Sequence, residues 1–172
     1  MKTILAKLLE LLEKLLPLVK KTEVIDNVPI VPTPQWTPVN EWDVQNRSKK
    51  FGDYPLDKKK KLFIMARQVC LDKNLSPQMT AELLATIFGE SFWNPFCQNE
   101  NKVNGKVVST DFGLTQLNDF YFLKPRKMTG EEAMLNPKLC VEIMADNFKQ
   151  GHADYWIAHR NQSFRAYLGK VV

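Results

Sequence analysis

The sequence is poor in the residues that build metal sites and disulfide frameworks. It has two histidines, and neither a CxxC nor an HExxH motif lies near them, which argues against a zinc site. Its three cysteines are odd in number and far apart, which argues against a disulfide framework and leaves at most one disulfide open. Cys70 and Cys140 fall in apolar helical patterns, where a thiol packs as a small hydrophobe. We therefore expect neither a metal nor another cofactor.

An apolar run long enough to cross a membrane is also lacking. Residues 1–21, MKTILAKLLELLEKLLPLVKK, are leucine-rich, but charges interrupt them every few residues and no small-residue cleavage site is obvious, so they make a poor signal peptide. At helical spacing their apolar side chains cover about half of the circle, which predicts an amphipathic helix that Pro17 ends or kinks near Leu16. Either residues 3–19 bind a membrane surface or self-associate, or the helix docks on its own domain or pairs in an oligomer.

Acidic residues are outnumbered: 24 lysines and arginines stand against 19 aspartates and glutamates, a formal net charge of +5. This basic excess suits an anionic partner, such as nucleic acid, an acidic membrane or the anionic polymers of a cell wall. No DNA- or RNA-reading signature accompanies the charge, so nucleic acid is not the expected partner.

Residues 22–50 are rich in proline, with four prolines in the stretch VPIVPTPQWTPVNEW. Prolines at this spacing favour extended backbone, which predicts a spacer or a strap along the next domain. Trp36 and Trp42 favour the strap, because exposed tryptophans on a free linker are costly. The chain thus divides into an N-terminal amphipathic helix (1–21), a Pro-rich linker or strap (22–50) and a globular domain (51–172).

The first half of the globular domain carries two strong helical signals. In DKKKKLFIMARQVC, the apolar residues that share one helical face are Leu62, Met65, Ala66, Val69 and Cys70. Ser76 and Pro77 are the N-cap and first position of a second helix. Residues 94–111 are polar and rich in turn formers, which predicts a loop or a small hairpin with Asn104-Gly105 as its turn.

Further helices follow in the second half. TGEE (129–132) is a capping box, and Asn136-Pro137 opens a helix that runs through Asn147. The aromatic-rich segment ADYWIAHRNQSFRAYL predicts two short helical pieces. The domain is therefore expected to be mainly α, with one small insert.

The second helix ends in an unusual stretch, GESFWNP (89–95), which raises the question of why a carboxylate stands where an apolar face should continue. Leu83, Ile87 and Glu90 are spaced to share that face, so Glu90 is expected on its buried side at the C-terminal end. Burial, the negative end of the helix dipole and water exclusion by Phe92, Trp93 or Phe112 would all raise its pKa. A glutamate that keeps its proton near neutral pH is a candidate general acid.

Two alternatives accompany this interpretation. Glu90 is otherwise a helix-end side chain in solvent or bonded to a loop amide. Thr86, one turn earlier, would lower the pKa of Glu90 if its hydroxyl donated to the carboxylate, but a threonine at such a position more often bonds its own helix backbone.

The order and spacing of several short motifs carry a family resemblance. These are Glu90-Ser91, Asn94-Pro95, Gly113-Leu114-Thr115-Gln116 and Leu117-Asn118. Together they resemble the lysozyme-like superfamily, and most closely the soluble lytic transglycosylases and goose-type lysozymes. The resemblance covers residues 85–120 well and 50–172 loosely, and it implies a lysozyme-like α-helical fold.

The resemblance implies roles for individual residues. Glu90 would protonate the glycosidic oxygen, and Asp111, in a segment similar to that of c-type lysozymes, would be the second carboxylate. The residues implied to bind or surround the substrate are Ser91, Asn94, Phe112, Gly113, Leu114, Gln116, Asn118, Tyr155 and His159. The alternative to a catalytic role is that Asp111 is a turn or cap residue. No metal ligand is implied.

The family commonly has an Ala-Tyr-Asn motif near the C-terminus, with the tyrosine beside the glutamate. Here the corresponding residues are Ala158, His159 and Arg160. Either His159 replaces the tyrosine, or Tyr155 or Tyr167 acts from another position, or His159 fills the edge of the core.

The resemblance therefore implies a lytic transglycosylase or muramidase that would cut the β-1,4 bond between N-acetylmuramic acid and N-acetylglucosamine in peptidoglycan strands. If Asp111 reaches the sugar, hydrolysis is expected; otherwise the substrate's 6-hydroxyl attacks and gives a 1,6-anhydro product, the route that the resemblance favours. The alternative is a non-catalytic glycan-binding or structural module of a phage particle or secretion apparatus. Its site of action would be the cell envelope, reached by phage delivery, by release through a partner such as a holin, or by a non-standard export route.

Overall fold

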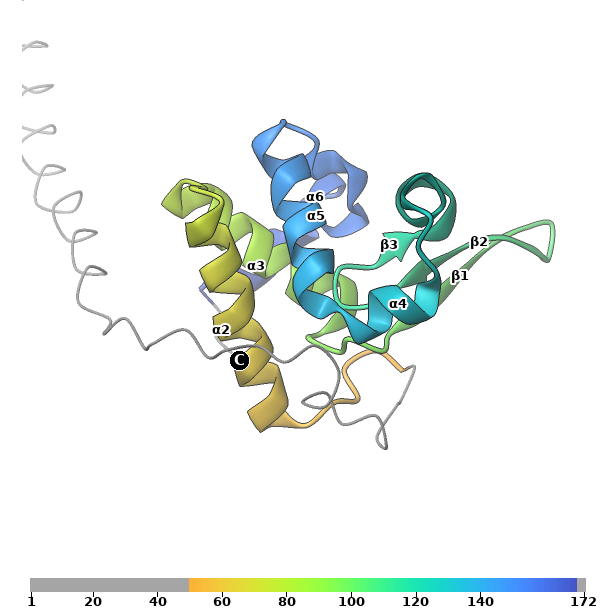
Figure 1. Ribbon diagram of the computed structural model, residues 1–172, viewed down its shortest axis with the longest axis horizontal. Helices are drawn as coiled ribbons and strands as arrows, with labels where there is room; N and C mark the ends of the chain where they lie inside the picture. The colour runs from red at the N-terminus through yellow and green to blue at the C-terminus, as the bar shows by residue number, and fades with distance from the viewer. Residues whose placement is uncertain (1–49, 170–172) are drawn as a thin grey trace, which may run out of the picture. The chain divides into compact units, whose positions relative to one another are not determined.

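The computed structural model describes residues 50–169, which form a mainly helical unit with one small antiparallel sheet (Figure 1). The predicted N-terminal helix (1–21) and residues 22–49 of the Pro-rich segment lie outside the described residues, and so do the proposed roles of both. Within residues 50–169, no helix has the length and apolar character needed to span a membrane.

The first two helices match the sequence signals. Helix α2 (Leu56–Asp72) buries the predicted apolar face, and helix α3 (Pro77–Ser91) starts at the predicted proline. The backbone N–H of Met79 donates to Ser76 Oγ at 3.1 Å, so Ser76 caps α3 as expected. Leu83 and Ile87 of α3 are fully buried, which places that helix face toward the core.

The insert after α3 is a hairpin that extends into a three-stranded sheet. Strand β1 (Gln98–Val103) pairs with β2 (Lys106–Phe112) around Asn104-Gly105, whose φ values of 50° and 76° are those of a tight hairpin turn. Strand β3 (Leu117–Asn118) adds to β2 and was not predicted, because two residues are too few to show an alternating pattern. The sheet order is β1-β2-β3.

Two short turns and two helices follow the sheet. They are the π-helical turn η2 (Asp119–Leu123), the 3-10 turn η3 (Lys124–Arg126), α4 (Gly130–Leu135) and α5 (Pro137–Lys149). The predicted capping box opens α4: Glu132 N–H donates to Thr129 Oγ1 at 3.1 Å, and Thr129 N–H donates to the Glu132 carboxylate at 2.7 Å. Asn136 caps α5, which ends two residues beyond the predicted Asn147.

The C-terminal segment forms three short helical pieces and not two. These are η4 (Ala153–Tyr155), α6 (Ile157–Arg160) and η5 (Ser163–Tyr167). Trp156 is extended and separates the first two, while Gln162, with φ of 63°, separates the last two. The indole N–H of Trp156 donates to the Thr115 carbonyl at 2.7 Å, so this break is anchored to the residues before β3.

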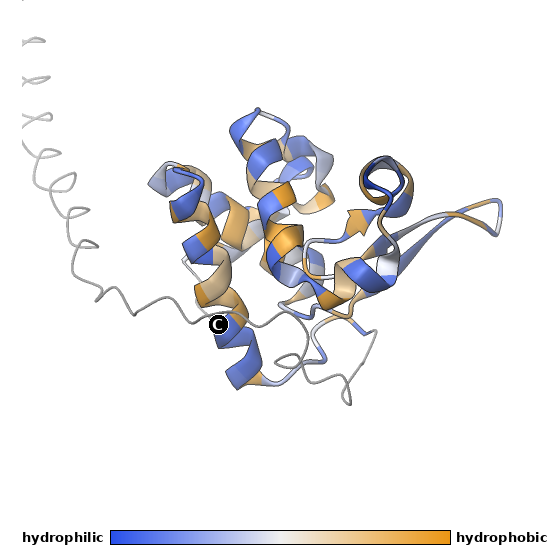
Figure 2. Ribbon diagram, in the orientation of Figure 1, coloured by the Kyte–Doolittle hydropathy of each residue, from blue (hydrophilic) through white to orange (hydrophobic). Residues whose placement is uncertain are grey.

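The core lies where the helices meet. Helix α5 packs against α2, α3 and α4, and α3 packs against α6 and η5. Figure 2 shows the apolar residues of α2, α3 and α5 turned inward and the polar residues outward. Cys70 and Cys140 are fully buried free thiols in this core, as expected from their apolar surroundings, and Cys97 is also buried and free.

Gly113 provides a test of the packing between the sheet and α4. Its φ is +79°, and an added Cβ would lie 3.3 Å from the Ala133 carbonyl oxygen; Gly105 has a similar φ of +76° but open space around it. We expect Gly105→Ala to lower the free energy of unfolding by about 1 kcal/mol through backbone strain alone, and Gly113→Ala by about 2–4 kcal/mol because crowding adds to the strain. Urea denaturation of both variants measures the difference, and equal losses would contradict this packing.

Candidate active site

The stretch GESFWNP ends α3 through two consecutive residues in the left-handed region. Phe92 has φ of 55° and Trp93 has φ of 63°. The hydroxyl of Ser91 donates to the Leu114 carbonyl at 2.6 Å, which ties the end of the helix to the segment before β3. The chain thus turns away directly after Glu90, and the carboxylate is left at the edge of the core.

Glu90 accepts a hydrogen bond from a distant part of the chain. Its Oε1 atom lies 2.8 Å from the backbone nitrogen of Ala158 in α6. This approach needs a glycine at the preceding position, because a Cβ on Gly89 would lie 2.8 Å from the Ala158 Cβ. Thr86 does not reach the carboxylate; its hydroxyl donates to the Glu82 carbonyl at 2.7 Å, as is common for a threonine within a helix.

The surroundings raise the pKa of Glu90 above its ordinary value. Burial is the main cause, and the negative charge of Asp111 adds to it. The Ala158 N–H and the charge of Arg160 act in the opposite direction but do not cancel the effect of burial. The expected direction is therefore confirmed, and Asp111 is an additional cause that burial arguments alone did not include.

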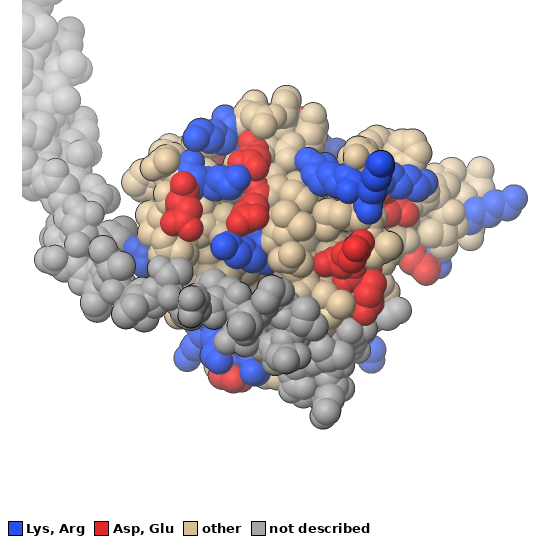
Figure 3. Space-filling view, viewed as in Figure 1, with Lys and Arg blue, Asp and Glu red and all other residues tan. Residues whose placement is uncertain are grey.

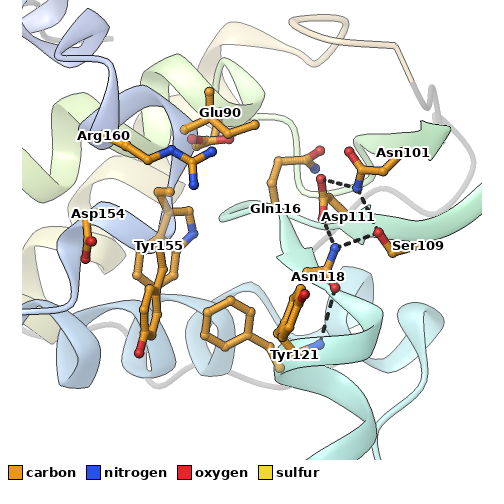
Figure 4. Close-up of a pocket in the computed structure, with 13 residues that line it drawn as sticks. Glu90, Asn101, Ser109, Asp111, Gln116, Asn118, Tyr121, Asp154, Tyr155 and Arg160 are labelled. Atoms are coloured by element: carbon orange, nitrogen blue, oxygen red, sulfur yellow. Dashed lines mark hydrogen bonds between the residues drawn. The ribbon is translucent and has the colours of Figure 1, made fainter. Parts of the chain in front are cut away.

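Glu90 opens onto a cavity of about 640 Å³ between the sheet and the C-terminal turns (Figure 4). The walls come from α3, β1, β2, β3, η2, η4 and α6. The lining residues are Glu90, Asn101, Ser109, Asp111, Gln116, Asn118, Tyr121, Phe122, Asp154, Tyr155, Trp156, Ile157 and Arg160.

Asp111 faces this cavity from β2 and is held there by two amides. The side-chain nitrogens of Asn118 and Asn101 donate to its two carboxylate oxygens at 2.8 Å and 3.0 Å. The same two amides donate to Ser109 Oγ, at 3.0 Å from Asn118 and 3.2 Å from Asn101. Asp111 is thus neither a turn nor a cap residue, and its carboxylate is fixed on the cavity wall.

Gln116 and Asn118 also line the cavity, as their predicted roles require. Gln116 has φ of 51°, and its amide nitrogen donates to the carbonyls of Cys97 at 3.0 Å and Gly113 at 2.9 Å. The Asn118 oxygen accepts the N–H groups of the first turn of η2. Both side chains therefore line the cavity and also hold the backbone segments that surround it.

Six of the expected substrate contacts are not among the residues that line the cavity: Ser91, Asn94, Phe112, Gly113, Leu114 and His159. For these residues the structure gives a supporting role in place of the expected contact. Asn94 is fully buried, and its amide donates to the Lys50 carbonyl at 2.7 Å. Gly113 makes its close approach to the Ala133 carbonyl and not to a sugar, and the Phe112 ring covers Gly130.

The aromatic side chains on the cavity wall are not the three that were expected to exclude water from Glu90. Neither Phe92, Trp93 nor Phe112 lines the cavity, whereas Phe122 and Trp156 do. These two rings stack with their centroids 5.4 Å apart. They therefore supply the apolar wall on that side of the cavity.

Of the three residues considered for the family's tyrosine, only Tyr155 lines the cavity. It is half-exposed and stacks on His152 with centroids 5.0 Å apart. His159 points elsewhere, with Nε2 3.3 Å from the Glu82 carboxylate, and Tyr167 packs on Phe88. Arg160 is the residue whose charge acts on Glu90 from this segment.

Several lining residues were not predicted, among them Asn101, Ser109, Tyr121, Asp154 and Arg160. A signal existed for one of them: strand alternation puts Ser109 on the face of Asp111. A regular hairpin closed by Asn104-Gly105 would pair Asn101 with Val108, and Asn101 reaches Ser109 only because the register shifts between Asn101 and Lys102. No such local signal exists for the others. Among the described residues, no group of three or more His, Cys, Asp or Glu side chains is arranged to hold a metal ion.

The raised pKa of Glu90 predicts a pH-dependent stability. The folded state keeps the Glu90 proton to a higher pH than the unfolded state, so stability is lost as the pH rises from the ordinary carboxyl pKa through the raised one. We expect Glu90→Gln to raise the free energy of unfolding by about 0.5–1 kcal/mol at pH 7 and by close to zero near pH 4. Urea denaturation at both pH values checks this, with Glu100→Gln on β1 as the exposed control. A gain of equal size at both pH values would contradict the burial of this charge.

Comparison with known proteins does not identify the chain: it matches no protein-family model, no curated protein and no solved structure at a significant level. The function is therefore inferred from the two carboxylates, the cavity between the sheet and the C-terminal turns, and the motifs that place them.

Proposed function

We propose that the chain is a peptidoglycan-cleaving glycosidase with a lysozyme-like fold, which cuts the bond between N-acetylmuramic acid and N-acetylglucosamine. One observation carries the proposal: a glutamate with a raised pKa and a second, hydrogen-bonded carboxylate line the same cavity. Glycosidases use this pairing because one carboxyl must donate a proton while the other meets positive charge on the sugar. The resemblance of residues 85–120 to lysozyme-like enzymes supports the same assignment.

Glu90 is the general acid/base of the proposed reaction. Its protonated form donates to the glycosidic oxygen as the C–O bond breaks, and the resulting carboxylate then accepts a proton from the attacking water. The Ala158 N–H bond and the positive charge of Arg160 stabilise the carboxylate formed in the first step. The proton that leaves in the first step is thus regained in the second.

Asp111 is the second carboxylate of the proposed reaction and acts at the sugar carbon C1. It either stabilises the oxocarbenium-like centre at C1 or bonds to it, and water then completes hydrolysis with retained configuration. The resemblance alone favours the other route, in which the acetamido group supports C1 and the 6-hydroxyl attacks. The placement of Asp111 on the cavity wall favours hydrolysis, because a carboxylate there can meet the positive charge directly.

The rest of the cavity suits an N-acetylated sugar chain. Tyr121 and Tyr155 are exposed aromatic rings on its walls and offer flat apolar faces to sugar rings. The amides of Gln116, Asn118 and Asn101 line the same cavity on the side of Asp111 and can exchange hydrogen bonds with hydroxyl and acetamido groups (Figure 4). The volume of about 640 Å³ is within the range of sites that bind small ligands.

The charge of the chain agrees with an anionic wall polymer as partner. Acidic and basic side chains are interspersed on the face drawn in Figure 3. Lys73, at the end of α2, pairs with Asp146 of α5 at 2.8 Å. The basic excess of the whole chain, to which the four consecutive lysines 58–61 of α2 contribute, acts as a general electrostatic attraction for an anionic polymer. Since peptidoglycan lies in the cell envelope, the proposed site of action is periplasmic or extracellular.

A second candidate function is a non-catalytic glycan-binding or structural module. The observation in its favour is the departure from the family's tyrosine motif, because His159 pairs with Glu82 and Arg160 acts on Glu90 where a tyrosine is usual. Such a module would bind glycan in the cavity without cleaving it.

The test is digestion of purified peptidoglycan, with the soluble muropeptides analysed by mass spectrometry. We expect products with reducing ends from the wild type. Glu90→Gln should lower the rate by about a thousandfold and Asp111→Asn by about a hundredfold, because each removes a carboxyl that meets charge or a proton in the transition state. Asp154→Asn is the matched control, since Asp154 lines the same cavity but has no assigned chemistry, and it should change the rate by less than about threefold.

Products with 1,6-anhydro ends, and little effect of Asp111→Asn, would instead assign the transglycosylase route. Binding of peptidoglycan without any product would favour the second candidate. Neither product nor binding, under conditions where a known lysozyme is active, would remove both candidates.

A further inference from the structure

Two contacts fasten α6 to α3, both made by glutamates on one face of α3. Glu82, Thr86 and Glu90 are four residues apart and therefore lie above one another on the helix. The Glu82 carboxylate lies 3.3 Å from Nε2 of His159, and Glu90 Oε1 lies 2.8 Å from the Ala158 nitrogen. Because Ala158 and His159 are consecutive, the two glutamates hold the same short peptide.

The pair of Glu82 and His159 is well enclosed for an interaction at the edge of a domain. Their side chains are 25% and 18% exposed. The imidazole stacks on the Phe164 ring with centroids 4.7 Å apart and an interplanar angle of 2°, and the Phe148 ring meets its edge at 5.3 Å. Gln78 donates to the other Glu82 oxygen at 2.9 Å. Both side chains are thus fixed from several directions, and the bond forms when Nε2 carries a proton.

We propose that Glu82 and His159 form a positioning pair, which holds α6 so that the Ala158 N–H stays on the Glu90 carboxylate. Neither residue lines the cavity, so the pair acts on Glu90 through its neighbours in α6, first of all Ala158. The absence of a side chain at Gly89 lets α6 come this close, and the pair supplies the attraction that keeps it there. The inference rests on the proposed function only where it assigns a catalytic consequence to Glu90.

Loss of the pair has a distinctive effect on the titration of Glu90. The charged groups that face Glu90 are Asp111 from β2 and Arg160 from α6, and the Cys97 thiol lies close by. The Ala158 N–H favours the ionised carboxylate, so weakening this bond raises the pKa of Glu90 further. Removal of the Glu82 charge by itself would lower the pKa of Glu90, and only slightly, because eight residues of helix separate the two by about 12 Å. Loss of the Ala158 hydrogen bond therefore raises the pKa of Glu90, whereas loss of the Glu82 charge alone would lower it.

The experiment uses the full chain, with the Glu90 carboxyl carbon titrated by NMR and exchange of the Ala158 amide measured alongside. In Glu82→Ala we expect Glu90 to titrate at higher pH than in the wild type, and the Ala158 amide to exchange about tenfold faster or more. We expect Glu82→Gln to retain both wild-type properties, because its amide oxygen still accepts from His159. On peptidoglycan, Glu82→Ala should lower kcat/KM by about tenfold and move the basic limb of the pH profile to higher pH.

Asp146→Ala is the matched control. It removes the ion pair with Lys73, 2.8 Å long, between α2 and α5, and should leave the Glu90 titration unchanged. His159→Phe keeps the stacking on Phe164 without the hydrogen bond, and should speed exchange of the Ala158 amide even if Glu82→Ala does not fold. A Glu90 titration that stays or moves to lower pH in Glu82→Ala, with unchanged Ala158 exchange, would overturn the positioning role. A wild type that cleaves no peptidoglycan would remove the proposed function alone, because the NMR readouts need no activity.

Discussion

The hydrogen bond from the Ala158 N–H to Glu90 is the contact on which the site depends. It joins two segments that are 68 residues apart, and it forms only because α3 ends in a glycine, a glutamate and a sharp left-handed turn. The bond gives a half-buried carboxylate one strong donor and leaves its other side open to the cavity. A carboxyl in that position is costly to ionise and yet not prevented from ionising, which is the property that acid/base catalysis requires.

The second carboxylate is arranged by a different principle. Asp111 lies on a strand, where alternation fixes which way it points, and amides from the two neighbouring strands hold its oxygens. The three-stranded sheet therefore fixes the position of the Asp111 carboxylate through side chains of all three strands. Glu90, at the end of α3, has a carboxyl that resists ionisation because it is largely buried. Asp111, in the sheet, has a carboxylate that is fixed by hydrogen bonds from polar neighbours. The surroundings of the two carboxyls therefore suit them to different roles.

The sequence predicted those parts that local rules encode. Ser76, the Thr129–Glu132 box and Asn104-Gly105 are caps and turns whose chemistry involves neighbours within four residues, and the structure confirms each of them. The motifs also placed Glu90, Asp111 and Gln116 at one cavity. The motifs did not separate residues that face a ligand from residues that hold the loops, so Ser91 and Asn94 were assigned contacts although both are fully buried. The contacts of Arg160 and Ala158 depend on chain topology, which no short pattern contains.

Among the described residues, five that are neither glycine nor asparagine have positive φ: Phe92 and Trp93 follow Glu90 and Gln116 lines its cavity, whereas Lys127 and Gln162 lie outside the cavity lining. Asn74 and Asn104 have positive φ values, but asparagine adopts that region with little cost. Phe92, Trp93 and Gln116 have no such tolerance, and each costs on the order of 1 kcal/mol in the left-handed region. Burial of Trp93 in the core, together with the two bonds donated by Gln116, offsets that cost, and the turn they maintain is the one that exposes Glu90. A glycine at these places would remove the backbone strain, but it would also remove the buried Trp93 ring and the Gln116 hydrogen bonds, so the strained residues serve the fold and the turn together.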